Sequence, residues 1–322
     1  MTTDAIRFEA VTKRYGRLAA LDGLSLAIPR GAMFGVIGPD GAGKTTAIRM
    51  ACGLVGPDGG TVRVLGLDPV QERRAITRAV GYLSQRFSLY GDLSIDENIA
   101  FQAEIHGVRG YGAARDRLLG MMQLTPVRTR RADRLSGGMK QKLALACTLI
   151  HQPQVLLLDE PTTGVDPVSR RELWKLLSEL LAQGLTIVMA TPYLDEAERC
   201  VRIALLNEGR ILAVDDPALL RAAMPGVLLE VIVDAHRPPV EVLASVPDVT
   251  DVQVFGDRAH VRIARAGGQA AVATLTAALR QRGILPVSVR PVPASLEDVF
   301  IDLVSRAARR PSPSVPPPGP RF

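Results

Sequence analysis

The sequence is poor in cysteine and in aromatic residues, and both shortages exclude classes of protein. Only three cysteines occur among 322 residues, Cys52, Cys147 and Cys200, and they stand far apart in apolar surroundings. They form neither a disulfide framework nor a metal-binding spacing, which suits a reducing compartment. Aromatic residues make up 4% of the chain, too few for a surface that stacks nucleic-acid bases. We therefore expect no nucleic-acid partner.

Long apolar runs are also missing. No run reaches the roughly 18 residues that a membrane-spanning helix needs, and no signal peptide opens the chain. We expect a soluble protein, so that a second chain would supply any membrane part. With 47% hydrophobic residues the chain can nevertheless bury a substantial core. The net charge of +6 is carried almost wholly by scattered arginine, which we attribute to coding composition rather than to function.

What the chain does contain is the phosphate-loop sequence Gly38-Pro39-Asp40-Gly41-Ala42-Gly43-Lys44-Thr45. In this pattern glycines let backbone N–H groups close around phosphate oxygens, the lysine neutralises the outer phosphates, and the hydroxyl reaches Mg²⁺. An apolar strand over residues 33–37 precedes the loop and a helix over residues 45–52 follows it. The N-terminus of that helix therefore also faces the anion, and this context disfavours the alternative of a plain Gly-rich turn.

Two further motifs carry chemistry. Residues 155–158 are a buried strand that ends in Asp159 and Glu160. Because neighbouring strand residues point to opposite faces, Asp159 could hold Mg²⁺ while Glu160 deprotonates the attacking water. The second motif, Leu135-Ser136-Gly137-Gly138, begins a helix whose free N–H groups form another anion site. A chain with one phosphate loop needs a second phosphate-facing helix only if that helix serves another subunit's nucleotide.

The first 224 residues alternate apolar strands with amphipathic helices, as α/β proteins do. A helix over residues 168–181 begins beside Pro167 and stops at Gly184. Between about residues 87 and 150 the strand signals vanish, and a capping box at Ser94 and Glu97 starts a helix that reaches about His106. We therefore expect an all-helical insert in the sheet domain. The clear strands are predicted over residues 35–37, 80–83, 155–158, 186–189 and 203–206.

The pattern restarts after Pro225. Strands are predicted over residues 227–233, 249–254, 259–263 and 284–289, and helices over 240–245 and 268–282. This order, strand–helix–strand–strand–helix–strand, indicates a small α+β ferredoxin-like domain over residues 225–306 that ends in a helix over 295–306. The Pro-rich residues 307–322 cannot pack and are predicted to be a disordered tail.

The order of phosphate loop, Gln85, the Leu135–Gly138 motif and the Asp159-Glu160 strand resembles the ATP-binding-cassette (ABC) ATPases, over residues 5–220. The resemblance implies ATP and Mg²⁺ as cofactors and a P-loop sheet core. It places catalytic roles on Glu160, Gln85 and Lys44, and metal contacts on Thr45, Gln85 and Asp159. The positions that match the family's nucleotide contacts are Tyr15, Gly38, Pro39, Asp40, Gly41, Ala42, Gly43, Lys44, Thr45, Thr46, Ser136, Gly137 and Gly138.

The resemblance also implies partners. Two cassettes would pair head to tail, in a homodimer or a heterodimer, so that Ser136 and Gly138 reach the other subunit's ATP and Asp166 lies across the seam. Gln85 would contact an integral-membrane permease at the cytoplasmic face of the plasma membrane. The segment Ser295-Leu296-Glu297-Asp298-Val299-Phe300 resembles ATPases that drive bacterial drug and polysaccharide exporters. We therefore expect an exporter ATPase that powers a separate permease.

One position departs from the family. Members carry a histidine that contacts the γ-phosphate where this chain has Pro192, and proline has no side-chain donor or acceptor. The histidines, His106, His151, His236 and His260, lie elsewhere in the pattern. Two alternatives therefore stay open beside the exporter ATPase: a regulatory or degenerate partner cassette with little turnover, and a soluble ABC ATPase outside transport.

Overall fold

The computed structural model describes residues 4–85, 88–234, 238–264 and 267–309. The chain divides into two units, Met1–Pro217 and Ala218–Phe322. The division falls before the boundary at residue 224 that the sequence suggested, because the short helix α8 (Pro217–Ala222) belongs almost wholly to the second unit. The predicted disordered tail begins too early, because residues 307–309 belong to helix α11 (Leu296–Arg309). The rest of that prediction lies outside the described residues.

The first unit is built on a six-stranded sheet in the order β5-β6-β7-β3-β8-β9. Every pair from β5 to β8 is parallel, and only the edge strand β9 runs antiparallel. All residues of β3, β6 and β7 are buried, which explains why these strands read as unbroken apolar runs. The strand predictions in this sheet are thereby confirmed. Its strands are β3 (Met33–Ile37), β5 (Val80–Leu83), β6 (Val155–Asp159), β7 (Thr186–Thr191), β8 (Arg202–Asn207) and β9 (Arg210–Asp215).

A second sheet of the first unit, in the order β2-β1-β4, is antiparallel. It comprises β1 (Asp4–Tyr15), β2 (Leu18–Pro29) and β4 (Gly59–Val64). No strand was singled out there from the sequence. Register shifts interrupt the pairing of β1 with both neighbours, and the burial pattern of β1 does not alternate regularly. Residues 23–28 of β2 do alternate between exposed and buried, and that signal was missed.

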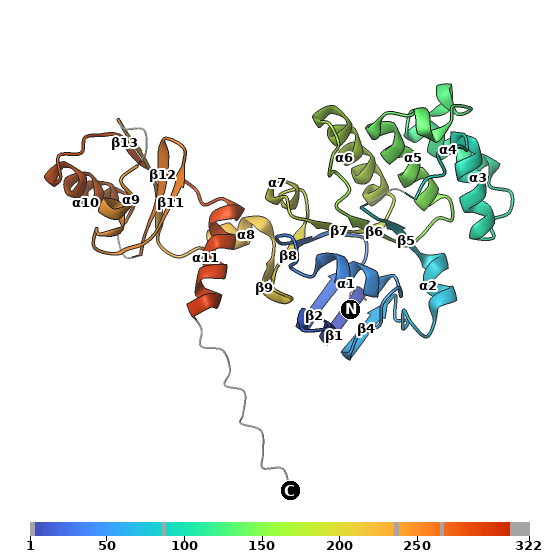
Figure 1. Cartoon of the computed structure of the whole chain (residues 1–322), viewed down its shortest axis with the longest axis horizontal. Helices are drawn as coiled ribbons and strands as arrows, with labels where there is room; N and C mark the ends of the chain where they lie inside the picture. The colour runs from blue at the N-terminus through green and yellow to red at the C-terminus, as the bar shows by residue number, and fades with distance from the viewer. Residues whose placement is uncertain (1–3, 86–87, 235–237, 265–266, 310–322) are drawn as a thin grey trace, which may run out of the picture. The chain divides into compact units, whose positions relative to one another are not determined.

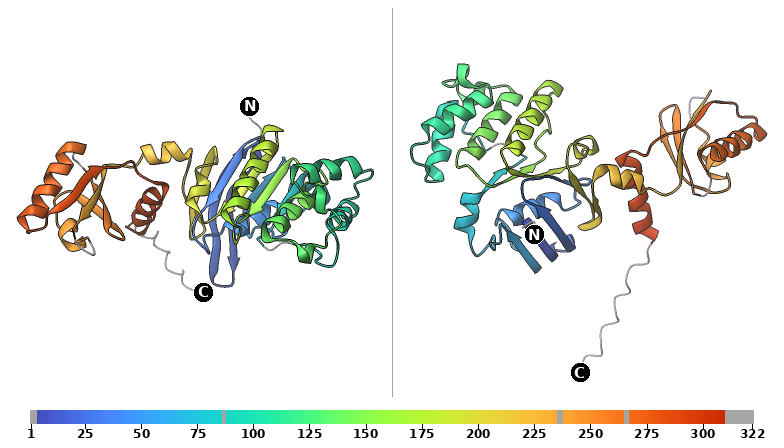
Figure 2. Two further views of the ribbon diagram at one scale, coloured as in Figure 1. Left: turned by 90° about the horizontal axis from the view of Figure 1, so that it is seen from above. Right: turned by 180° about the vertical axis from the view of Figure 1, so that it is seen from behind.

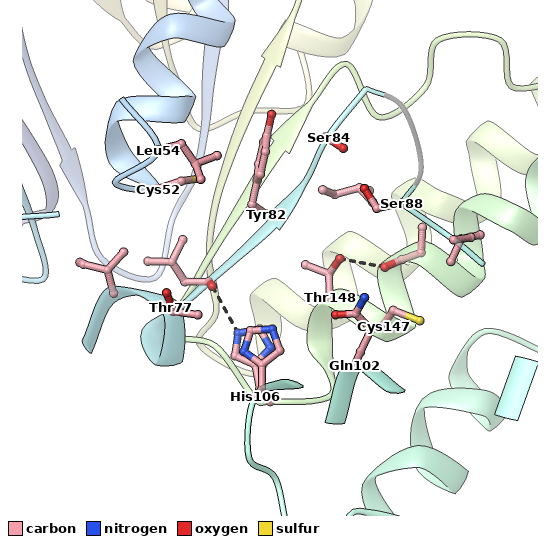
Figure 3. Close-up of a pocket in the computed structure, with 16 residues that line it drawn as sticks. Cys52, Leu54, Thr77, Tyr82, Ser84, Ser88, Gln102, His106, Cys147 and Thr148 are labelled. Atoms are coloured by element: carbon pink, nitrogen blue, oxygen red, sulfur yellow. Dashed lines mark hydrogen bonds between the residues drawn. The ribbon is translucent and has the colours of Figure 1, made fainter. Parts of the chain in front are cut away.

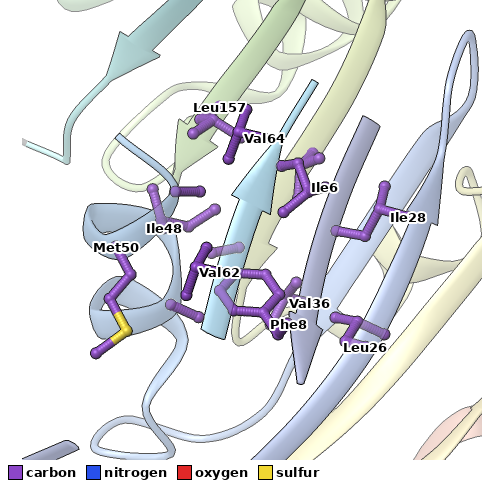
Figure 4. Close-up of a cluster of buried hydrophobic side chains, with 14 of the residues drawn as sticks. Ile6, Phe8, Leu26, Ile28, Val36, Ile48, Met50, Val62, Val64 and Leu157 are labelled. Carbon is purple, nitrogen blue, oxygen red and sulfur yellow. The ribbon is translucent and has the colours of Figure 1, made fainter. Parts of the chain in front are cut away.

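The core of the first unit lies between these two sheets and around helix α1 (Lys44–Ala51), as Figure 4 shows. Ile6 and Phe8 of β1 face Ile48 of α1 and Val36 of β3 in this cluster. Burial of such side chains stabilises the fold by about 1.5–3 kcal/mol each. Because α1 follows the phosphate loop directly, this packing also fixes where the loop stands.

Helices make up the insert. Its main helices are α3 (Ile95–Ile105), α4 (Gly112–Met121) and α5 (Gly137–Leu149), which lie side by side in Figure 1 and Figure 2. The predicted capping box is present: Ser94 Oγ accepts from the Glu97 N–H at 3.2 Å, and Glu97 Oε2 accepts from the Ser94 N–H at 2.7 Å. From residue 88 to 150 the described chain contains no strand, as expected. The unit's other helices are α2 (Arg73–Ala79), α6 (Pro167–Ala182) and α7 (Leu194–Ala197).

The second unit has an antiparallel sheet in the order β11-β12-β10-β13. Numbered within the unit this is the order 2-3-1-4, and helices follow its first and third strands, which confirms the ferredoxin-like arrangement. The fourth strand lies two residues later than predicted. Helix α11 is held to the sheet by a hydrogen-bond contact between His260 Nδ1 and Asp298 Oδ1 at 3.2 Å and by an ion pair between Arg262 and Asp302. The elements are β10 (Val227–Val233), α9 (Val240–Ala244), β11 (Val249–Phe255), β12 (Arg258–Ile263), α10 (Gly268–Gln281), β13 (Pro286–Pro291) and α11 (Leu296–Arg309).

Candidate functional site

The predicted site residues gather at the carboxyl edge of the parallel sheet. The phosphate loop follows β3, Gln85 follows β5, Asp159 ends β6 and Thr191 ends β7. Because these strands are parallel neighbours, their ends meet at one edge, which is where open α/β sheets bind ligands.

At two positions of the phosphate loop the surrounding backbone leaves no space for a side chain, so glycine is required. A Cβ at Gly38 would lie 2.1 Å from the carbonyl oxygen of Leu206, and one at Gly43 would lie 2.3 Å from that of Ala20. Gly43 also has a φ of +104° and Gly41 a φ of +80°, in the left-handed region that L residues avoid. The loop thus presents bare backbone, which is what close approach to phosphate oxygens requires.

Lys44 lies buried at the centre of this loop. Its Nζ donates hydrogen bonds to the carbonyl oxygens of Gly38, at 2.8 Å, and Pro39, at 2.9 Å, and stands 3.9 Å from Asp40 Oδ1. Burial lowers the pKa of Lys44, while nearby carboxylates, Glu160 foremost, oppose that shift. The ammonium group is therefore held where phosphates of a bound nucleotide would meet it.

Thr45 and Asp159 are brought together by the fold. Thr45 Oγ1 donates to Asp159 Oδ1 at 3.0 Å, and the hydroxyl of Tyr82 donates to Asp159 Oδ2 at 3.3 Å. Burial and the charge of Asp159 raise the pKa of Tyr82 to about 12, so the phenol stays protonated. A hydroxyl and a carboxylate side by side fit Mg²⁺, which takes oxygen ligands and is bound through one or two carboxylates. Tyr82 was not predicted as a site residue, although it stands in the Gly81–Gln85 segment.

Glu160 has partners different from those of Asp159. Gln85 Nε2 donates to Glu160 Oε2 at 2.9 Å, and Thr163 Oγ1 donates to the same oxygen at 3.2 Å. The backbone of Glu160 turns at a φ of +51° directly after β6, and its N–H bonds the Ala190 carbonyl at 2.8 Å. Gln85 thus stands with Glu160 rather than within hydrogen-bond distance of Thr45 and Asp159. Thr163 is a contact that the sequence did not reveal.

The Ser136–Gly138 motif caps helix α5. Ser136 Oγ accepts from the Met139 N–H at 3.3 Å. A Cβ at Gly138 would lie 2.2 Å from Ser169 Oγ of α6. Asp166 caps α6 by accepting from the N–H groups of residues 168 and 169, each at 3.0 Å. The hydroxyl of Ser169 is the main cause that lowers the pKa of Asp166, and the N–H of Ser169 is the second. Two helix N-termini with positive dipole ends therefore stand side by side.

The remaining predicted positions are Tyr15 and Pro192. Tyr15 ends β1, is 48% exposed, and has Lys13 Nζ 5.7 Å from its ring centre. Pro192 follows the buried Thr191, whose Oγ1 accepts from the Tyr193 N–H at 3.1 Å. His106, His151 and His260 have their contacts elsewhere, and His236 lies outside the described residues.

Comparison with known proteins agrees with this geometry. A family model described as ABC transporter matches residues 21–163. The probable multidrug ABC transporter ATP-binding protein YbhF of Escherichia coli (strain K12) is 38% identical over 97% of this chain, which spans only 54% of that relative. The Nod factor export ATP-binding protein I of Paraburkholderia xenovorans (strain LB400) is 38% identical over 95% of this chain and 99% of its own length.

Solved structures support the same assignment. An ATP-binding subunit of an ABC transporter is 27% identical, covers 68% of this chain and 92% of its own, and has a TM-score of 0.62. A dimeric ATP-binding cassette in a post-hydrolysis state with ADP and Pi is also 27% identical, covers 66% of this chain and 98% of its own, and has a TM-score of 0.59. With the phosphate loop, the acidic strand end and the capped α5 helix in place, the chain belongs to the ATP-binding proteins of the ABC transporter family.

Proposed function

We propose that the chain is the ATP-binding and ATP-hydrolysing subunit of an exporter that powers a separate membrane permease. The observation that carries this proposal is the pairing of Gln85 with Glu160 beside the pairing of Thr45 with Asp159. One pair suits a water-activating base and the other suits a metal, so the site has parts for hydrolysis as well as for binding. The names of the relatives, which include multidrug, Nod factor and daunorubicin resistance proteins, support an exported substrate.

In the proposed reaction the loop and Lys44 hold the phosphates of ATP. Thr45 and Asp159 would hold Mg²⁺, and Gln85 would contact it from its place beside Glu160. The bound ion would neutralise charge on the phosphates of ATP. Glu160 accepts the proton of the attacking water, and the hydrogen bonds from Gln85 and Thr163 keep its carboxylate oriented. Positioning of this kind is the main contribution that a protein makes to phosphoryl transfer.

A second cassette is part of the proposal. Ser136 and Gly138 stand beside Asp166 and α6, where the paired helix N-termini offer an anion site that the chain's own phosphate loop does not use. We infer that they meet the γ-phosphate of ATP bound to another copy or to a different cassette. Tyr15, exposed at the end of β1, would stack on the adenine of the chain's own ATP.

The proposed permease contact is the groove of about 250 Å³ between the insert and the sheet, shown in Figure 3. It is lined by Tyr82 of β5, by Ser84 directly after that strand, by Gln102 of α3 and by His106, which caps the C-terminus of α3. Ser84 directly precedes Gln85, so occupancy of the ATP site and of this groove would be linked. Within the described residues none of the helices has the length and apolar character to cross a membrane. We place the chain on the cytoplasmic face of the membrane, through its permease.

Lys44→Ala tests the proposal. The ammonium group makes charge-assisted hydrogen bonds, each worth about 1.5–3 kcal/mol, so its loss should weaken Mg-ATP binding by about 10- to 100-fold in calorimetry. Arg73→Ala, at an exposed position of α2, is the matched control and should bind as the parent does. Equal affinity in parent and Lys44→Ala would contradict the assignment of the loop.

A regulatory cassette with little turnover is the second candidate, because Pro192 replaces the family's phosphate-contacting histidine. The intact pair of Gln85 and Glu160 favours turnover. Phosphate release by the parent with Mg-ATP separates the two candidates: ATP binding without release would select the regulatory function. Copurification with a membrane subunit would argue against the third alternative, a soluble ABC ATPase outside transport.

A further inference from the structure

We propose that Glu196 is a positioning residue of the ATPase site, which ties the loop that carries Asp166 to the loop that carries Pro192. The inference rests on the proposed hydrolysis of ATP. Glu196 lies in the short helix α7 and is 1% exposed. No role was assigned to it from the sequence, although it lies in the segment that carries Pro192, and its contacts join segments distant along the chain.

The first connection is a buried hydrogen bond. Thr162 Oγ1, which is wholly buried, donates to Glu196 Oε1. The hydroxyl of Thr191, at the end of β7, also bonds the Glu196 carboxyl. Thr162 follows β6 and lies in the loop that leads to Asp166. A single carboxyl group therefore holds the ends of two neighbouring strands in one arrangement.

The loop that Glu196 holds also orients the proposed base. Thr163, the next residue after Thr162, donates to Glu160 Oε2 at 3.2 Å. The N–H of Glu160 bonds the Ala190 carbonyl at 2.8 Å, directly before Thr191. A shift of Glu196 would therefore be transmitted to Glu160 through the backbone on both sides. Because Pro192 has no side-chain donor or acceptor, these contacts give its loop a route by which to act on the reacting water.

A second set of contacts, made by Arg170, links helix α6 to the segment that follows Pro192. Arg170 of α6 stands 5.5 Å from the ring centre of Tyr193 and 3.8 Å from Asp195 Oδ2. Within the described residues, Arg170 Nε and Glu196 Oε2 are both buried and lack a hydrogen-bond partner. Buried polar atoms are rarely left unpaired, and these two carry opposite charge when Glu196 is ionised. They could pair when the Asp166 loop meets a second cassette.

The pKa of Glu196 agrees with this placement. Burial raises its pKa, and the hydrogen bonds from Thr162 and Thr191 oppose the shift. In the interior, the carboxyl group is therefore stabilised by its hydrogen-bond partners and not by water. Within the described residues, the groups that act on this carboxyl group lie in these two loops, in α6 and in α7 itself, and such a placement suits a positioning role.

Steady-state hydrolysis and ATP affinity of the full chain test the proposal. Thr162→Val removes the hydroxyl with little change of shape, and Glu196→Ala removes the carboxyl. Each should lower kcat about 10- to 100-fold, the range for a misplaced catalytic group, with the ATP dissociation constant within about twofold of the parent. Thr162→Ser should restore kcat, because it returns the donor. Thr186→Val is the matched control: it removes an equally buried threonine hydroxyl at the other end of β7, and kcat should stay near parental.

The outcomes are distinct. Parental kcat in Thr162→Val and Glu196→Ala would overturn the positioning role alone, as would a loss that Thr162→Ser does not restore. If Glu196→Ala fails to fold, Thr162→Val and Thr162→Ser still decide. A parent that binds ATP but releases no phosphate would overturn the proposed hydrolysis, and this inference with it.

Discussion

Acid should destabilise the first unit through a pair of stacked histidines. His106, at the end of α3, and His151, after α5, lie with ring centres 3.9 Å apart and planes within 2°. A ring nitrogen of His151, Nε2, bonds the Val80 carbonyl at 3.2 Å, and the Nδ1 atoms of both rings are buried without a partner among the described residues. Protonation of either ring would place a charge in this confined space.

The magnitude follows from the pKa of His151, which burial and the neighbouring His106 lower from 6.5 to about 4. Between pH 6.5 and pH 4, His151 is protonated in the unfolded chain and neutral in the folded chain. The free energy of unfolding is therefore highest above pH 6.5 and falls as the pH drops toward 4. Integrated from pH 7.5 to pH 5, the loss is about 2 kcal/mol.

Urea unfolding at pH 7.5 and pH 5 measures this loss, with the fluorescence of Trp174, the only tryptophan, as a probe of the first unit. The parent should lose about 2 kcal/mol more than His151→Gln between the two pH values, because the amide can still donate to Val80 but does not titrate. His106→Gln should also flatten the pH dependence, since burial lowers the pKa of His106 too. The reasoning is refuted if His151→Gln and the parent lose the same free energy.

Three further predictions concern the proposed function. Glu160→Gln with ATP should shift the chain from monomer toward dimer in sizing experiments, and adding Ser136→Arg should abolish that shift; a dimer insensitive to both changes would contradict the composite site. Pro192→His should speed phosphate release, by up to the 10²–10³ that a donor aimed at transition-state charge contributes; a slower variant would show that the site uses another γ-phosphate contact. A photo-crosslinker at Gln102 should capture the membrane subunit and one at Thr274, exposed on α10, should not; the reverse result would move the docking surface to the second unit.

Much of the site was predictable because its signals are local. The phosphate loop, Asp159 and Glu160 each follow an apolar strand in the chain, and burial on both faces makes those strands continuous in hydrophobicity. Neighbouring parallel strands have their carboxyl ends at the same edge of the sheet. Residues that directly follow these strands therefore gather at that edge, independently of the length and path of the connecting segments. The capping box at Ser94 was equally readable, since its hydrogen bonds join residues three apart.

By itself, then, the sequence determined the phosphate-loop and Asp159-Glu160 motifs, the helical insert and the ferredoxin-like order of the second unit. Only the tertiary structure decided the partners. Gln85 meets Glu160, Tyr82 meets Asp159, and Thr162 meets Glu196 across 75, 77 and 34 positions of sequence. No spacing encodes such contacts, because they depend on which strands become neighbours. The antiparallel sheet of β1, β2 and β4 was missed as well. Register shifts disturb the alternation of buried and exposed residues in β1, whereas the alternation over residues 23–28 of β2 was readable and was overlooked.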